Sequence, residues 1–120
     1  MTGAGIRREQ WRFFKTADGG EVAKDEFRSL PIDGRALLAD AMNRYRRGLL
    51  LDREFEHVAG DIYAIRVSSD SNHYRLLFSH EGPVSTICLC LTAIRKNQRK
   101  LPKEDLARAR KRLVTWRANG

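Results

Sequence analysis

The sequence predicts an α+β fold of element order β-αα-βββ-α, in which one twisted antiparallel sheet carries an N-terminal helical hairpin and a C-terminal helix. Two changes of pattern along the chain indicate this class. Apolar residues recur at helical spacing over residues 21–47, and they alternate in the manner of strands over residues 62–94. A short aromatic strand precedes the helices, and a helix that begins near a proline follows the last strand.

The N-terminal part of the chain is predicted to form one strand and two helices. Residues 11–15 are the strand, and residues 21–30 form the first helix after a glycine-rich turn. Pro31 interrupts the helical pattern, and Asp33 can cap a second helix that ends before Gly48. The short connection predicts that the two helices form an antiparallel hairpin.

Three strands and one helix are predicted for the rest of the chain. The strands are residues 62–67, 74–80 and 84–94, and a turn-rich stretch separates the first two. Pro102 begins the last helix, which has acidic residues in its first turn and basic residues after them, as the helix dipole favours.

The first two of these strands form a hairpin whose register follows from its turn. A turn centred on Asp70 and Ser71 makes one face of the hairpin wholly apolar or aromatic, and that face is predicted to meet the core. On the other face Arg66 then lies directly opposite Arg75, with His73 close by. The apolar face consists of Tyr63, Ile65, Val67, Tyr74, Leu76 and Phe78.

The facing arginines have two interpretations, because like charges directly opposite each other destabilise a sheet. Each arginine could pair with a carboxylate from elsewhere, such as Asp61 or Glu56. Alternatively, the two guanidinium groups bind an anion, and His73 is a candidate for proton transfer beside it.

The composition is that of one folded domain. With 42% hydrophobic and 32% charged residues, the 120-residue chain is not disordered, and its longest apolar run, residues 87–91, is too short for a membrane helix. No signal peptide is visible, so we expect residues 1–120 to be one cytoplasmic domain with a flexible extension at residues 1–9. Cys88 and Cys90 are expected to be buried, reduced thiols, and no metal site or cofactor is predicted.

The net charge of +8 lies at one end of the chain. Residues 1–94 hold 13 basic and 13 acidic side chains, whereas residues 95–120 hold 10 basic side chains against Glu104 and Asp105. Such one-ended charge is typical of polyanion binders, with nucleic acid first and an anionic membrane surface second. Residues 95–100, four of them basic, lie between a strand end and a helix start, and they are predicted to contact phosphates.

Five segments in a fixed order also carry a family resemblance. They are residues 11–14 (WRFF), 60–66 (GDIYAIR), 73–78 (HYRLLF), 91–98 (LTAIRKNQ) with Lys100 and Pro102, and 105–113 (DLARARKRL). Together they resemble the HigB branch of the RelE/ParE toxin superfamily, over nearly the whole chain.

This resemblance implies the toxin of a type II toxin–antitoxin pair, with a fold like that of compact microbial ribonucleases. Such a toxin cuts mRNA, usually on the ribosome, and uses no metal. The RNA 2′-hydroxyl attacks the adjacent phosphate, which leaves a cyclic phosphate and a free 5′-hydroxyl. The implied partner is a HigA-like helix-turn-helix antitoxin, with which the toxin forms an oligomer, and no membrane is involved.

Carried over by position, the resemblance assigns the site residues. Arg75 and Lys96 are the transition-state electrophiles, and Arg66 holds the phosphate. His73 is the candidate for proton transfer for a different reason: it is the only histidine on the face of the hairpin that carries the arginines. The predicted RNA- or ribosome-binding residues are Arg95, Gln98, Arg99, Lys100 and Lys103.

Two other functions remain open from the sequence. One is a ParE-like toxin of the same fold that inhibits DNA gyrase, and the other is a basic nucleic-acid-binding module without catalysis. Arg66, Arg75 and Lys96 favour the ribonuclease, because a gyrase inhibitor needs no cluster that stabilises a phosphate.

Overall fold

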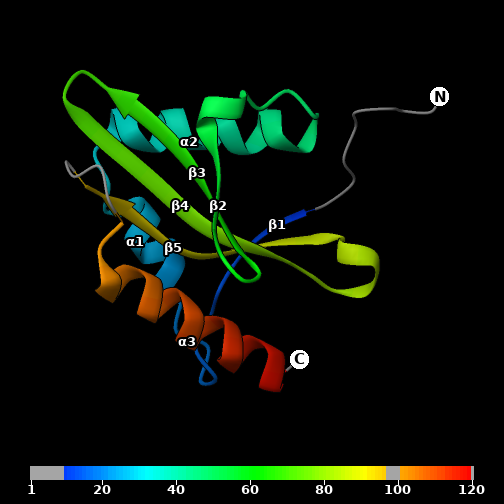
Figure 1. The fold of residues 1–120 in the computed structure, drawn as a ribbon. Helices are drawn as coiled ribbons and strands as arrows, with labels where there is room; N and C mark the ends of the chain where they lie inside the picture. Colours follow the sequence, from blue (N-terminus) through cyan, green and yellow to red (C-terminus); the bar gives the residue numbers. More distant parts are fainter. Residues whose placement is uncertain (1–9, 97–100, 120) are drawn as a thin grey trace.

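Within residues 10–96 and 101–119, which the computed structural model describes, a five-stranded mixed sheet of order β1-β5-β4-β3-β2 forms the centre of the fold (Figure 1). The predicted α+β class is confirmed, and the predicted extension at residues 1–9 lies outside the described residues. The elements are β1 (Gln10–Phe13), α1 (Val22–Arg28), α2 (Ile32–Arg46), the 3-10 helix η1 (Asp52–Glu54), β2 (Phe55–Ala59), β3 (Ile62–Ser69), β4 (Asn72–Glu81), the 3-10 helix η2 (Pro83–Ser85), β5 (Ile87–Arg95) and α3 (Lys103–Asn119).

Two features of the sheet differ from the prediction. β2 is an additional edge strand, and a bulge between His57 and Ala59 interrupts its pairing with β3, so its five residues carry no clear alternation. β1 pairs with β5 in parallel, so the sheet is mixed and not purely antiparallel. That pairing joins residues 10–13 to residues 87–90, a separation over which no local pattern can predict contact.

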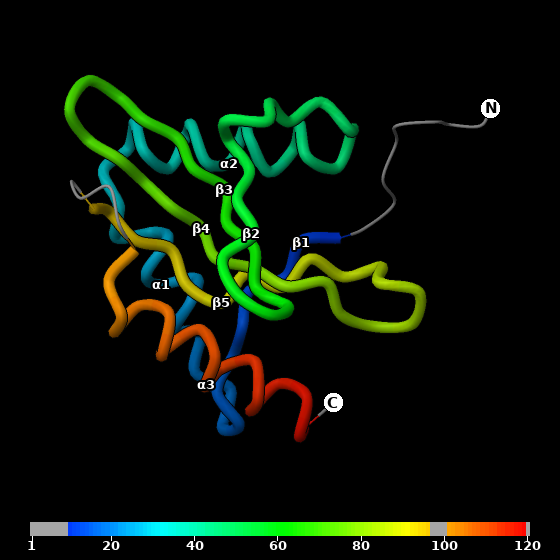
Figure 2. Tube along the Cα trace, viewed as in Figure 1, coloured from blue at the N-terminus to red at the C-terminus, as the bar shows by residue number. Residues whose placement is uncertain are grey.

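The helices cover both faces and one edge of the sheet (Figures 1 and 2). α2 packs on β3 and β4 over one apolar cluster, and α3 packs on β5 over a second cluster on the opposite face. α1 runs along β5 beyond the short segment that pairs with β1. The two N-terminal helices are consecutive, as predicted, but each packs on a different part of the sheet.

The core confirms the predicted hairpin faces. All six predicted core-face residues belong to the α2 side, where Tyr63 is half-buried and the other five are buried. Cys88 and Cys90 are fully buried thiols, as predicted, and burial raises the pKa of the Cys90 thiol. These thiols are therefore packing residues.

A β-bulge in β5 decides which side chains reach the arginine face of the hairpin. The register of β4 and β5 shifts by one residue, so that beyond the bulge Ile94 pairs with Arg75 and Arg95 pairs with Tyr74. Arg95 therefore lies on the α2 side, and Lys96, the next residue, falls on the side of Arg75. Without the bulge, strict alternation along β5 would place Arg95 on the side of Arg75 and Lys96 on the α2 side.

A close contact between α2 and β4 holds the tip of the hairpin. A Cβ placed on Gly34 of α2 would lie 2.5–2.7 Å from three ring carbons of Tyr74, whose side chain is fully buried. Tyr74 directly precedes Arg75, so the close fit of Gly34 against this ring sets the distance between α2 and the strand segment that carries the arginine pair.

Replacing Gly34 with alanine is therefore expected to destabilise the protein. Alanine should gain about 1 kcal/mol from helix propensity, but overpacking against the ring costs about 1–3 kcal/mol, so the net effect is a loss. Urea denaturation should show a lower midpoint for Gly34→Ala. Asn43→Ala, at an exposed position of the same helix, should not lower it, and an unchanged midpoint for both variants would contradict the close contact.

Candidate active site

The β3–β4 hairpin places Arg66 directly opposite Arg75, as the sequence predicts. Ser69 and Asn72 are the last pair, so Asp70 and Ser71 alone form the turn. Asp70 has a φ of 54°, a conformation that aspartate tolerates better than most residues. The register that brings the two guanidinium groups together thus follows from a two-residue turn.

Arg66 and Arg75 have different environments. The side chain of Arg66 is 42% exposed and donates a hydrogen bond from Nη2 to the carbonyl of Arg53 in η1, over 3.0 Å. Its Nε lies 3.8 Å from Oε1 of Glu56, so one of the two predicted carboxylates does reach it. Arg75 is only 6% exposed. The predicted alternative, Asp61, instead forms an ion pair with the C-terminal helix.

His73 lies at the open end of the same face. Its Nδ1 is 2.8 Å from Oγ of Ser68, the residue opposite it on β3, and its side chain is exposed. Its backbone carbonyl accepts a hydrogen bond from the N–H of Lys96, over 2.8 Å. The histidine ring is therefore oriented by a neighbour beside the arginine pair.

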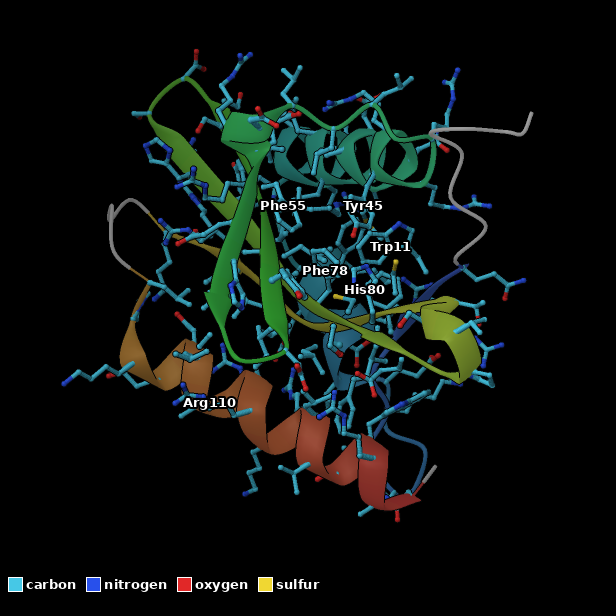
Figure 3. All side chains as sticks on the ribbon, turned by 45° about the vertical axis from the view of Figure 1, so that its right-hand side comes forward. Trp11, Tyr45, Phe55, Phe78, His80 and Arg110 are labelled. Atoms are coloured by element: carbon cyan, nitrogen blue, oxygen red, sulfur yellow. The ribbon has the colours of Figure 1, made fainter. Side chains whose placement is uncertain are left out.

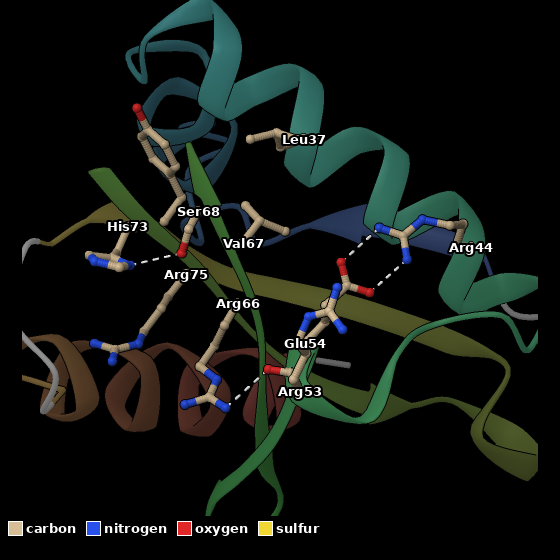
Figure 4. A pocket seen from close by; sticks show the side chains of 10 residues that line it. Leu37, Arg44, Arg53, Glu54, Arg66, Val67, Ser68, His73 and Arg75 are labelled. Carbon is tan, nitrogen blue, oxygen red and sulfur yellow. Dashed lines mark hydrogen bonds and ion pairs between the residues drawn. The ribbon is translucent and has the colours of Figure 1, made fainter. Parts of the chain in front are cut away.

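These three residues line an open cleft of about 600 Å³ between the hairpin, α2 and η1 (Figure 4). The cleft lies beside the part of β3 that extends past its pairing with β2. Its lining combines cationic, hydroxyl and apolar groups, and consists of Leu37, Arg44, Arg53, Glu54, Arg66, Val67, Ser68, His73, Tyr74 and Arg75.

A bidentate ion pair holds the η1 wall of the cleft to α2. Nη1 and Nη2 of Arg44 donate to the two carboxylate oxygens of Glu54 over 2.6 and 2.9 Å, and the N–H of Leu51 donates to Oε1 over 3.0 Å. Asp40 accepts from Nε of Arg44. Hydrogen bonds from Arg44 lower the pKa of Glu54. The pair thereby fixes η1, whose Arg53 carbonyl holds Arg66.

Lys96 lies outside the lining of this cleft, on the β5 side of the same sheet face. Its Nζ is 3.8 Å from Oδ2 of Asp105, a buried residue in the first turn of α3. Arg108, one turn further along α3, donates to the other oxygen of Asp105 over 2.5 Å. Asp105 thus holds two cations at the start of α3, and neither it nor Arg108 is a predicted site residue. Their i, i+3 spacing is the one sequence signal that could have indicated the pair.

Glu26 of α1 extends this network. Arg112 donates to both of its carboxylate oxygens over 2.8 Å, and Thr92 donates to it over 2.7 Å. Burial alone would raise the pKa of Glu26, but hydrogen bonds from Arg112 and Thr92 and the nearby positive charges lower it. Glu26 is therefore ionised at neutral pH and joins α1, β5 and α3.

Several basic residues of the C-terminal segment have hydrogen-bond or ion-pair partners within the chain. Nη2 of Arg117 lies 3.0 Å from carboxylate oxygens of both Glu81 and Asp61, and the hydrogen bonds that Arg117 donates to Glu81 raise the pKa of Arg117. Arg95 donates to the side-chain oxygen of Asn72. Lys103 begins α3 and is exposed, whereas Gln98, Arg99 and Lys100 lie outside the described residues.

Comparison with known proteins identifies the family. The model of the family described as "Phage derived protein Gp49-like" matches residues 25–114, which include Arg66, Arg75 and Lys96. The chain belongs to this Gp49-like family. Relatives from two Mycobacterium tuberculosis strains, CDC 1551 / Oshkosh and ATCC 25618 / H37Rv, both called "Probable endoribonuclease HigB1", are 39% identical over 110 residues, which cover 89% of this chain and 84% of each relative. The predicted resemblance to HigB is confirmed.

Two further features concern membranes and metals in the HigB-like chain. No helix in the described part of the chain is long and apolar enough to span a membrane. Among the same residues, no three His, Cys, Asp or Glu side chains come together as metal ligands.

The Glu26 network predicts a pH-dependent contribution to stability. Because folding lowers the pKa of Glu26, its contribution is present above its ordinary value of 4.5 and is lost as the pH falls through the lower value of the folded state. Glu26→Gln should cost about 1–3 kcal/mol at pH 7. Urea denaturation from pH 7 to pH 3 should show this difference shrinking below pH 4.5. A difference that stays constant to pH 3 would contradict the ionised network.

Proposed function

We propose that this HigB-like chain is the toxin of a toxin–antitoxin pair and cleaves mRNA as an endoribonuclease. The observation that carries the proposal is the facing pair Arg66 and Arg75 on the wall of an open cleft. Folding alone disfavours such a pair, and a phosphate seated between the two guanidinium groups removes the repulsion. The name of the 39% identical relatives supports the same activity.

The proposed reaction is an attack of the RNA 2′-hydroxyl on the adjacent phosphorus. The 2′-oxygen loses its proton and bonds to phosphorus, and the bond from phosphorus to the 5′-oxygen breaks. The 5′-oxygen takes up a proton, so the products are a 2′,3′-cyclic phosphate and a 5′-hydroxyl. Negative charge concentrates on the phosphate in the transition state, where fixed cations stabilise it most.

Each site residue takes one part in this reaction. Arg66, held by the Arg53 carbonyl, binds the phosphate, and buried Arg75 stabilises its developing charge. Lys96 approaches from the β5 side of the same face as a second electrophile. His73 exchanges protons through Nε2, because Ser68 occupies Nδ1.

The same proposal includes the place where the toxin acts and the protein that neutralises it. The toxin acts in the cytoplasm on mRNA bound to the ribosome, and a HigA-like antitoxin neutralises it in an oligomeric complex. Lys103, together with Arg95, Gln98, Arg99 and Lys100, provides the contacts to ribosomal or messenger RNA.

Arg75→Met should remove toxicity and lower the cleavage rate about 100-fold to 1,000-fold, since one preorganised donor to the phosphate is lost. Primer extension on mRNA after induction in growing cells should show new 5′ ends with the wild type and none with Arg75→Met. Arg110→Met, at an exposed position of α3, is the matched control and should cleave normally. Breaks in DNA without mRNA cuts would indicate a gyrase inhibitor, and growth without either would indicate a non-catalytic binding module.

Glu54→Gln should lower the cleavage rate about 10-fold, because weakening the Arg44 ion pair releases η1 and with it the carbonyl that orients Arg66. Asp40→Asn weakens the same arginine's contacts without touching η1 and should leave the rate within about 2-fold. The positioning role requires that Glu54→Gln has no further effect in an Arg66→Met background. Additive losses in the double variant would show that Glu54 acts independently of Arg66.

A further inference from the structure

An exposed apolar strip lies where the chain leaves α2 and enters η1. Leu49 and Leu51, which follow α2, are 53% and 44% exposed. They border an indentation of about 210 Å³ that is lined by Tyr45, Gly48, Leu50, Leu51, Asp52 and Phe55. Leu50, between them, packs against the core, but the exposure of Leu49 and Leu51 is not explained by the core of this chain.

A row of stacked rings continues this indentation across the edge of the sheet. The ring of Phe55 on β2 stacks on buried Tyr45 at 6.2 Å and on Tyr63 of β3 at 5.5 Å, and His57 stacks on Tyr63 at 5.0 Å. Phe55 and Tyr63 are half-buried and His57 is exposed. Figure 3 shows Phe55 and Tyr45 close together where α2 meets the sheet. Leucines and rings thus form one surface, the apolar strip: Leu49, Leu50, Leu51, Phe55, His57 and Tyr63.

The charges that flank the apolar strip select its partner. Arg46 and Arg47 precede the leucines, Arg53 follows them, and all three side chains are exposed. Asp52, which is also exposed, is the one carboxylate in the lining of the indentation, so the flanking charge is positive on balance. A second copy of this chain would have to bring the same arginines against each other in a symmetric contact, which disfavours self-association. An acidic protein segment with apolar side chains satisfies both halves of the surface.

We propose that the apolar strip is the docking surface of the antitoxin. An amphipathic, acidic segment of the antitoxin inserts aliphatic side chains into the indentation beside Leu51 and Phe55, and it places carboxylates over Arg46, Arg47 and Arg53. This inference rests on the proposed function, because it requires a cognate antitoxin. The surface that binds the antitoxin would then meet the cleft that holds Arg66 and Arg75 only at η1, whose Arg53 belongs to both.

The decisive variant is Leu51→Asp, which puts a carboxylate at the rim of the indentation. Its partner in the test is the antitoxin encoded by the reading frame adjoining the toxin gene. Val114→Asp makes the same change at another exposed apolar residue, on α3, and is the matched control. Two measurements are made for each variant: toxicity on induction with and without antitoxin, and the Kd for purified antitoxin by calorimetry, in an Arg75→Met background that permits purification.

Leu51→Asp should remain toxic, escape neutralisation and bind antitoxin at least 100-fold more weakly, whereas Val114→Asp should be neutralised and bind as the wild type does. Circular dichroism checks that Leu51→Asp is folded, and Arg47→Glu, which leaves the leucines intact, should also weaken binding, by about 10-fold. If Leu51→Asp and Arg47→Glu both bound antitoxin with the Kd of the wild type, the proposal would be overturned. A Leu51→Asp variant that loses toxicity but binds antitoxin normally would also overturn it, because the strip would then contact RNA or the ribosome. The same holds if the wild type is a dimer and only Leu51→Asp dissociates it, because the strip would then be the contact between two copies of this chain. If the wild type is not toxic at all, the proposed function fails, while calorimetry still tests the docking surface.

Discussion

The repulsion between Arg66 and Arg75 is the constraint on which the rest of the site depends. Two guanidinium groups face each other on adjacent strands, one of them almost fully buried. Facing like charges cost up to about 1 kcal/mol on a sheet, so the surrounding fold must hold them in place. It does so through the two-residue turn at the hairpin tip, the contact of Tyr74 with Gly34, and the acceptors that η1 and β2 present to Arg66.

Ion pairs on both sides of the sheet hold the backbone segments that carry these cations. On one side Arg44 and Glu54 join α2 to η1, and on the other side Arg112 and Glu26 join α3 to α1. Both pairs are bidentate, so they fix orientation as well as distance. Much of the positive charge of α3 therefore stabilises the fold through ion pairs. The cations that remain to bind a phosphate lie on the β3–β4 hairpin and near the start of α3.

The hairpin and its arginine pair could be predicted from the sequence, because one turn of two residues and strict alternation fix the register of every residue from 63 to 78. Lys96 could be predicted as a basic residue but not placed, since its side of the sheet is set by a bulge that alternation does not show. The cleft and the Arg44–Glu54 pair could not be predicted either, because they depend on tertiary contacts of η1, whose three residues have no periodicity. Asp105 is visible in the sequence as a helix-dipole residue, and only the fold brings Lys96 to it.

The most direct measurement of the central claim is the thermal stabilisation of the protein by an RNA oligonucleotide whose 2′-hydroxyls are methylated, so that it binds but cannot be cleaved. A ligand that binds only the folded protein stabilises it by RT ln(1 + [L]/Kd), so the shift in Tm reports the affinity for the oligonucleotide, and the variants show how much of it the arginine pair supplies. The wild type should gain stability with rising oligonucleotide. Arg66→Met and Arg75→Met should fold with stabilities within about 1 kcal/mol of the wild type and lose most of that gain. If both variants were stabilised by the oligonucleotide as much as the wild type, the facing arginines would not be the phosphate site.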